Sequence, residues 1–168
     1  MKWIWVTLGM LAVIVVAALV IGWLLPEAHR ASRQATFQAP PDKVWALITG
    51  VEAFPTWRTD VTTVQRLPDR EGRPVWIEEG RNGRLTLAVE RSDPPRLLVT
   101  RIADPDLPFG GTWTYEISPA PGGSTLTITE DGVIYNPFFR VMARFVFGHE
   151  GTLAAYLSAA DARLASAR

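Results

Sequence analysis

The chain has 168 residues, of which 48% are hydrophobic, and its 17 basic and 17 acidic residues leave no net charge. A neutral chain lacks the basic surface that is expected of a nucleic-acid-binding protein. The absence of cysteine excludes a disulfide framework and a thiolate metal site. The part after residue 25 has the length of one domain and is large enough to bury a hydrophobic core.

The N-terminal segment differs from the rest, because 20 of the 23 residues from 3 to 25 are apolar and none is charged. About 20 apolar residues are needed for a helix to cross the hydrocarbon core of a bilayer. Trp3, Trp5 and Trp23 lie at its two ends, where indole rings favour the headgroup region. A cleaved signal peptide has a shorter apolar run, and a buried core helix has a polar face. Residues 1–26 are therefore predicted to anchor the protein in a cell membrane.

The side of the membrane on which the remaining chain lies is left open. Lys2 precedes the apolar segment, and Arg30 and Arg33 follow it, so the positive-inside rule favours neither orientation. Residues 27–32 are predicted to form a short polar connector, and residues 33–168 to form one globular domain.

The globular part is predicted to begin with a short strand at residues 33–38, which the Ala-Pro-Pro-Asp run at 39–42 ends. Pro41 suits the first turn of a helix that ends at Gly50, and a second helical turn follows through residues 51–57. Short breaks rich in Pro, Gly and Asp separate the later strands, which allows only antiparallel neighbours. These six strands are expected at residues 61–67, 74–79, 84–92, 96–102, 112–118 and 124–134.

The strands alternate apolar and polar residues, so one face of the sheet must be covered. From Pro137 onward, apolar residues recur at helical spacing, with Asn136 as the expected N-cap. Gly148 and Gly151 are expected to weaken this C-terminal helix in its middle or to kink it. We expect the helix to cover the apolar face of the sheet.

Three stretches of the sequence are typical of one known superfamily. The first is Pro-Pro-Asp-Lys-Val-Trp at 40–45 with Val-Glu-Ala-Phe-Pro-Thr-Trp at 51–57. The second is Gly-Thr-Trp-Thr-Tyr-Glu-Ile at 111–117 with the following strand at 123–132, and the third is the end of the last helix at Tyr156 and Leu157. Over residues 32–165 the chain thereby resembles the START-like (SRPBCC) superfamily, and most closely its polyketide cyclase/dehydrase and lipid-transport branch.

This resemblance implies an α+β helix-grip fold, in which a seven-stranded, curved antiparallel sheet wraps around a long C-terminal helix and leaves an apolar cavity. Members of the superfamily bind or act on lipids, polyketides, sterols and other hydrophobic molecules. The expected function is therefore the binding of a lipid or another hydrophobic small molecule by a membrane-anchored domain. The alternative is a cyclase, aromatase or dehydratase that acts on a polyketide-like substrate. No cofactor, metal or nucleic-acid partner is expected.

Candidate chemistry is sparse. The chain has two histidines, and His149 is the one candidate for a general acid or base, with an exposed or capping histidine as the alternative. Arg58 is expected either to pair with an acidic group of a ligand or to form a surface salt bridge. Glu130 and Arg101 each continue an apolar set of strand residues, so they are expected to form a buried ion pair in the cavity or to lie at wet strand ends.

Four further residues are candidates to line the cavity and orient a ligand: Trp113, Tyr115, Tyr135 and Arg144. Each has packing or a position at the rim of the cavity as its alternative. Residues 136–147 carry four phenylalanines and two arginines, a mixture that is typical of membrane surfaces and is equally explained by core packing.

Overall fold

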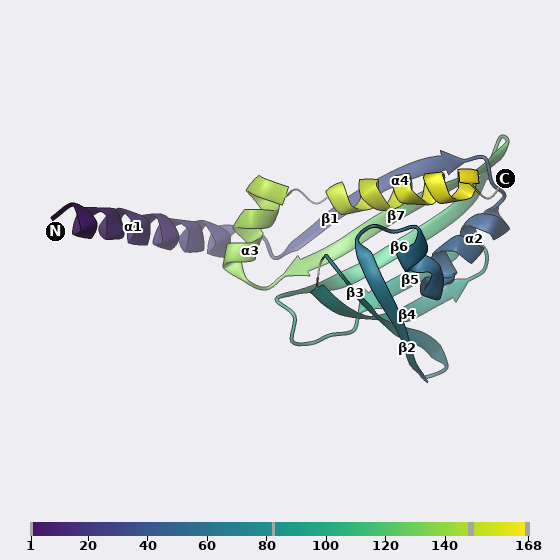
Figure 1. The fold of residues 1–168 in the computed structure, drawn as a ribbon, viewed down its shortest axis with the longest axis horizontal. Coiled ribbons are helices and arrows are strands. Elements are labelled where there is room, and N and C mark those ends of the chain that lie inside the picture. The colour runs from purple at the N-terminus through teal and green to yellow at the C-terminus, as the bar shows by residue number, and fades with distance from the viewer. Residues whose placement is uncertain (1, 82, 148–149, 167–168) are drawn as a thin grey trace.

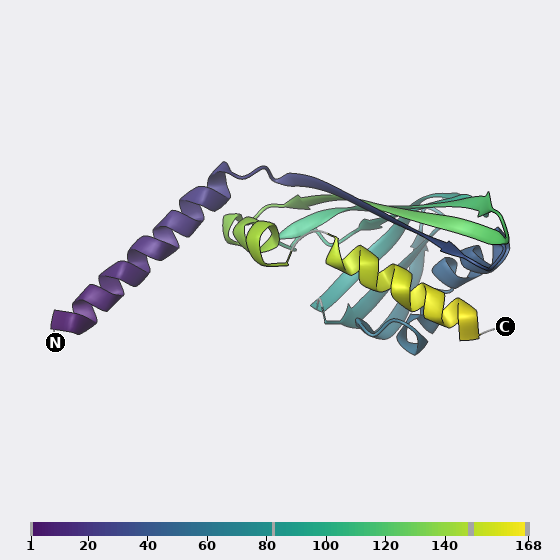
Figure 2. The same ribbon diagram turned by 90° about the horizontal axis from the view of Figure 1, so that it is seen from above.

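The computed structural model describes residues 2–81, 83–147 and 150–166. A single helix, α1 (Lys2–Leu24), projects from a body made of one sheet and several shorter helices (Figure 1, Figure 2). Within the described residues, α1 is the one helix that is long and apolar enough to cross a membrane. Its side chains are almost all exposed, and Gly22 is its one buried residue.

The sheet contains seven strands, all antiparallel to their neighbours, in the order β1-β7-β6-β5-β4-β3-β2. Consecutive strands from β2 to β7 pair with each other, and β1 completes the sheet by pairing with β7. This arrangement confirms the predicted seven-stranded antiparallel sheet. The strands are β1 (Ala28–Phe37), β2 (Val61–Arg70), β3 (Arg73–Gly80), β4 (Gly83–Asp93), β5 (Leu97–Ile102), β6 (Phe109–Ala120) and β7 (Gly123–Ile134).

Strand β1 begins earlier than the predicted start at residue 33. Ala28 already pairs with Val133, so most of the predicted connector belongs to the sheet. The early part of the strand is polar because most of its side chains are solvent-exposed. Its inward positions still alternate, since Ala31 and Phe37 are buried at an even spacing along the strand.

The core lies between the sheet and three helical elements, α2 (Pro41–Thr49), the 3-10 helix η1 (Val51–Thr56) and α4 (Gly151–Ser166). Helix α4 runs across the face of the sheet formed by β1, β7 and β6 (Figure 1). Its buried residues include Leu153 and Tyr156, which are part of the main apolar cluster. Five different elements contribute deeply buried side chains to this cluster: Phe37, Val44, Phe54, Ile128 and Leu153.

The helical segment predicted from Pro137 is divided. Helix α3 (Pro137–Met142) is followed by a π-helical turn, η2 (Ala143–Phe147), and α4 begins at Gly151. Asn136 is the predicted N-cap, and its Oδ1 accepts hydrogen bonds from the backbone N–H groups of Phe138 and Phe139. The π turn breaks the α-helical register before Gly151, which is a weak helix former. The other expected weak point, Gly148, lies outside the described residues.

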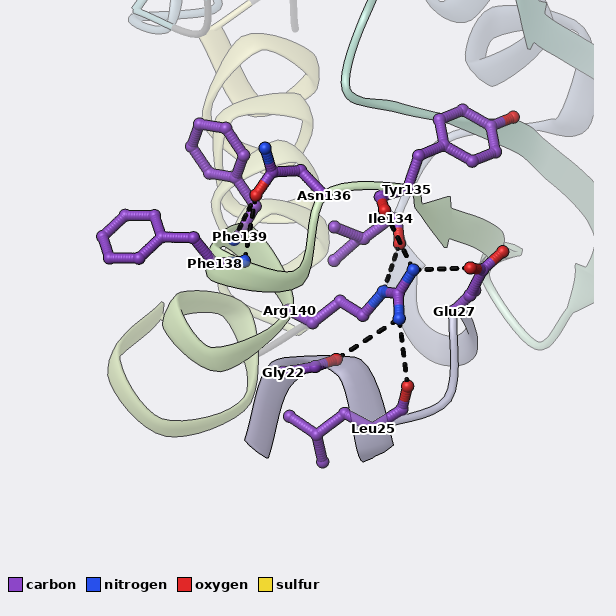
Figure 3. A network of polar contacts seen from close by, with 9 residues as sticks. All are labelled: Gly22, Leu25, Glu27, Ile134, Tyr135, Asn136, Phe138, Phe139 and Arg140. Atoms are coloured by element: carbon purple, nitrogen blue, oxygen red, sulfur yellow. Dashed lines mark hydrogen bonds and ion pairs between the residues drawn. The ribbon is translucent and has the colours of Figure 1, made fainter. Parts of the chain in front are cut away.

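Helix α3 packs against the end of α1, and Arg140 joins the two (Figure 3). The Arg140 side chain is only 6% exposed. Its Nη1 donates to the carbonyl oxygens of Gly22 and Leu25 at 3.3 and 3.4 Å, which are among the last carbonyls of α1. Its Nε donates to Ile134 O at 2.7 Å, and Nη2 donates to Tyr135 O at 2.9 Å and to the Glu27 carboxylate. All five guanidinium N–H groups are thereby used.

The two helices also touch directly at Gly22. A Cβ atom at this position would lie 2.0 Å from the carbonyl oxygen of Pro137, a distance that no side chain can occupy. Glycine at residue 22 is therefore required for the first turn of α3 to lie against the last turn of α1.

We expect Arg140→Leu to loosen α3 from α1. The substitution leaves several carbonyl oxygens without their donor, and we expect the free energy of local opening of α3 to fall by about 2–3 kcal/mol. Amide hydrogen exchange over residues 137–142 of the full chain measures this change. Arg144→Leu, an exposed arginine of the same segment, is the matched control and should have little effect. Equal exchange rates in the two variants would contradict the prediction.

Candidate functional site

A cavity of about 610 Å³ lies between the sheet and the helices α3 and α4. This volume is in the range of small-molecule binding sites, about 300–1,000 Å³. Strands β3 to β7, the start of β1 and the helices η1, α3 and α4 all contribute to its wall. Most of the wall is apolar, with Leu85, Leu87, Leu98, Ile102 and Trp113 on the sheet side and Met142 on the helix side.

The register of β5 decides which of its residues face the cavity. Leu98, Thr100 and Ile102 line it, so the alternate residues of the strand lie on the outer face. Arg101 is on that outer face, where its Nε lies 2.7 Å from Oε1 of Glu90 and both side chains are largely exposed. Of the two alternatives for Arg101, the buried ion pair with Glu130 is not formed, and Arg101 lies on the solvent-exposed face instead of lining the cavity.

A buried cluster of charges lies in the wall of the cavity. Arg58 follows η1, and its side chain is 10% exposed. Its Nη2 donates to Asp60 Oδ2 at 2.7 Å, and its Nη1 lies 3.1 Å from Oε2 of Glu78, which is 8% exposed. Glu78 also accepts a hydrogen bond of 2.9 Å from the indole Nε1 of Trp76. A surface salt bridge was the alternative prediction for Arg58. Arg58 does form salt bridges, but its side chain is buried in the wall of the cavity.

Aromatic rings and carboxylates together hold the Arg58 charge. Its guanidinium carbon lies 4.9 Å from the ring centre of Phe54 and 5.1 Å from that of Tyr156, which are cation–π distances. Burial alone would lower the pKa of Arg58, but the hydrogen bond to Asp60 and the charge of Glu78 outweigh it and raise the pKa. For Asp60 burial acts in the opposite direction and would raise the pKa, because it also disfavours the charged form. The hydrogen bond from Arg58 and the charge of Arg58 outweigh this effect and hold the pKa of Asp60 below its ordinary value. Both groups are ionised at neutral pH.

Two tyrosines form part of an aromatic group next to this cluster. The ring centres of Tyr115 and Tyr156 are 5.8 Å apart, and Trp113 lies 6.1 and 6.0 Å from them. Burial raises the pKa of both tyrosines well above 10, although the charge of Arg58 opposes the shift. Both hydroxyls therefore remain protonated at neutral pH, and that of Tyr115, which lines the cavity, adds polarity without charge.

A second polar group lies in the wall of the cavity on β1 and β7. The Nε2 atom of His29 is 3.5 Å from Oε1 of Glu130, and both residues line the cavity. Burial lowers the pKa of His29 below 6.5, and the charge of Asp131 opposes this shift. The imidazole lies over Gly132, where a Cβ atom would be 2.3 Å from the ring. Glycine at residue 132 thus makes room for the His29 side chain.

The structure brings four of the predicted site residues to the cavity, namely Arg58, Trp113, Tyr115 and Glu130. Tyr135 is 53% exposed, and Arg144 is also exposed. Neither of these two lines the cavity, although Phe139, Met142 and Ala143 between them do. His149 lies outside the described residues, so its role stays a prediction.

Four ionisable residues of the cavity were missed from the sequence: His29, Asp60, Glu78 and Arg81. Glu78 could have been found, because it is two residues from Trp76 and shares its face of β3. His29 could be assigned to the cavity only if the strand was known to begin at Ala28. No pattern in the sequence marked Asp60 as a cavity residue. No group of three or more potential metal ligands occurs within the ranges 2–81, 83–147 and 150–166.

The sequence model of a family described as polyketide cyclase/dehydrase and lipid transport matches residues 28–164. This range begins at the first residue of β1 and reaches almost to the end of α4. No curated protein sequence matches the chain.

Solved structures with the same fold include enzymes and a protein of the START superfamily. The START superfamily protein from Mycobacterium smegmatis has a TM-score of 0.68 and 18% identity, over 83% of this chain and 99% of that chain. The Zhui aromatase/cyclase from a Streptomyces species has a TM-score of 0.67 and 17% identity, over 82% and 94%. A point mutant of norcoclaurine synthase from Thalictrum flavum, in complex with a transition-state analogue, has a TM-score of 0.65 and 12% identity, over 83% and 95%. These similarities confirm the START-like fold.

We expect Arg58→Met to destabilise the domain by about 3–5 kcal/mol, because Asp60 and the buried Glu78 lose their counter-charge. Chemical denaturation of the full chain in detergent, followed by tryptophan fluorescence, measures the loss. Arg96→Met is the matched control, since Arg96 pairs with Asp93 on the surface and such pairs contribute about 0–1 kcal/mol. A similar loss in both variants would show that the buried pairing is not what stabilises the site.

Proposed function

The chain belongs to the polyketide cyclase/dehydrase and lipid transport family, and on this basis we propose that it is a membrane-anchored domain that binds a lipid or another hydrophobic small molecule. The observation that carries the proposal is the cavity of about 610 Å³ with its mostly apolar wall. A site of this kind gains affinity by removing apolar ligand surface from water, and its few polar groups orient the ligand.

The membrane anchor supports the same proposal. Helix α1 has 23 residues, about 34 Å at the rise of an α-helix, which is enough to cross a hydrocarbon core of about 30 Å. In a bilayer it would hold the cavity where hydrophobic molecules are most concentrated. A lipid or a lipid-like molecule is therefore the ligand that best fits both parts of the chain.

The charges in the cavity wall restrict the head group of the ligand. Two arginines, Arg58 and Arg81, are outnumbered by three carboxylates, Asp60, Glu78 and Glu130. Arg58 is already paired with two of these carboxylates, and Arg81 is exposed and contributes to the low pKa of Asp60. The exposed Arg81 is then the cation that an anionic head group could reach, and three carboxylates in the same wall oppose the binding of such a group. A neutral, hydroxyl-bearing or basic ligand fits this wall better than the acidic ligand expected for Arg58.

A second candidate function is an enzyme of the cyclase type. The pair formed by His29 and Glu130 favours it, because a histidine and a carboxylate in the wall of a cavity are suited to proton transfer. The aromatase/cyclase of similar fold is an analogy in its support. Conversion of a bound molecule during incubation would distinguish catalysis from binding alone: a dehydration is seen as the loss of water in its mass, and a mass-neutral cyclisation as a new species in its chromatogram or NMR spectrum.

The first test of the binding proposal blocks the cavity. The full chain in phosphatidylcholine vesicles is irradiated with a long-chain alcohol that carries a diazirine. Cross-links to the cavity-lining peptides are quantified by peptide mapping, so that labelling of α1 within the bilayer is not counted. We expect Ile102→Trp to reduce cross-linking roughly 10-fold or more, because overpacking a site costs about 1–3 kcal/mol. Val99→Trp, on the same strand but facing outward, is the control and should cross-link like the wild type. Unchanged labelling of Ile102→Trp would refute binding in this cavity.

The second test addresses the head group. The same photoreactive alcohol is compared with its sulfate ester, which has the same chain and a permanent negative charge. We expect the alcohol to label the cavity at least about 10-fold more efficiently, because burying an unpaired anion costs several kcal/mol. Preferential labelling by the sulfate ester would show that Arg58 or Arg81 is available to a ligand despite the carboxylates.

A further inference from the structure

Exposed apolar side chains gather at one place outside α1. In the part of the chain that the structure describes, the large apolar side chains exposed beyond α1 are Tyr135, Phe138, Phe139 and Phe145. All four lie between the end of β7 and the π-helical turn η2, and their exposed fractions range from 45% to 67%. Core packing, one of the two explanations for this aromatic segment, leaves Tyr135, Phe138 and Phe145 at least half exposed, and it covers Phe139 only in part.

The contact between α3 and α1 determines where this aromatic surface lies relative to a bilayer. The backbone of Pro137 touches Gly22, which is within the last turn of the apolar helix. Whatever depth Gly22 has in a membrane, the first turn of α3 has the same depth. The end of a 23-residue span lies at the boundary between the acyl chains and the headgroups. The rings of Phe138 and Phe139 leave α3 at this level and point away from Arg140 (Figure 3).

The Arg140 contacts make this placement rigid. The guanidinium group binds carbonyl oxygens of α1 and of the residues that follow β7, so it holds the end of the span, the end of the sheet and α3 together. Only three residues, 25–27, connect α1 to β1. The aromatic surface therefore cannot swing away from the span without loss of these bonds.

We infer that α3 and η2 lie in the headgroup region of the same bilayer that α1 crosses, with Phe138 and Phe145 in contact with lipid. The inference rests on the proposed membrane anchoring. Aromatic residues together with the exposed Arg144 are the composition that favours this region of a bilayer.

This position has a consequence for the cavity. Phe139, Met142 and Ala143 line the cavity, and Phe139 is at the same time 45% exposed. Segment 139–143 is thus the wall between the cavity and the lipid. A hydrophobic ligand has its shortest path into the cavity past this wall, directly from the bilayer and without passing through water.

The test uses the absence of cysteine from the chain, which allows single-cysteine variants of the full protein. Phe138→Cys and Phe145→Cys are labelled with a polarity-sensitive fluorophore in phosphatidylcholine vesicles. Val13→Cys, at the middle of α1, reports on the anchor, and Ser158→Cys, exposed on α4, reports on water. Quenching is measured with lipids that carry a nitroxide either near the headgroup or deep in the acyl chain.

We expect blue-shifted emission at residues 138 and 145, with greater loss of intensity from the shallow nitroxide than from the deep one. The Val13 position should show the reverse order, and the Ser158 position should show neither the shift nor the quenching. If Val13 is quenched while residues 138 and 145 behave like Ser158, the anchor stands and the inference about α3 is overturned. If Val13 is not quenched either, the anchoring proposal fails and the inference fails with it.

Discussion

The pairing of a buried arginine with two carboxylates is the interaction on which the cavity depends. Arg58 and Asp60 lie two residues apart in the segment between η1 and β2, and Glu78 comes from β3. None of them would be stable in an apolar wall alone, because an isolated buried charge is very costly. Their pairing lets polar groups remain beside the aromatic cluster around Tyr156 without opening that region to water.

A second arginine acts in a different way at the other end of the cavity. Phe109 on β6 and its partner Ile134 on β7 lie close to α3. Tyr115, which lies beside Arg58, is six residues further along β6, a distance of roughly 20 Å. Here Arg140 binds mainly carbonyl oxygens, two of them at the negative end of the α1 dipole. Arg58 neutralises charge within the wall, whereas Arg140 joins three elements of the backbone. Of these two arginines, Arg58 lines the cavity and Arg140 does not.

The fold could be predicted from the sequence because alternation and turn residues are local signals, and the six later strands follow them. The cavity residues were harder to predict. The two faces of β5 both carry apolar residues, Leu97 and Val99 on one and Leu98 and Ile102 on the other. The sequence therefore did not determine which face points inward, or on which side of the sheet Arg101 lies. Alternation along β3 places Glu78 on the same face as Trp76, but only the tertiary contact with Arg58 shows that the two charges are paired, with Asp60 as the local partner of Arg58.

The three residues between α1 and β1 limit how far the domain can travel. Fully extended, they span about 10 Å, and the bonds of Arg140 prevent even this extension. With α1 in a bilayer, the domain cannot act as a shuttle that carries a ligand across the gap between two membranes. Any ligand of this cavity would then enter and leave at the surface of that one membrane, and its delivery to a distant site would require a second, mobile carrier.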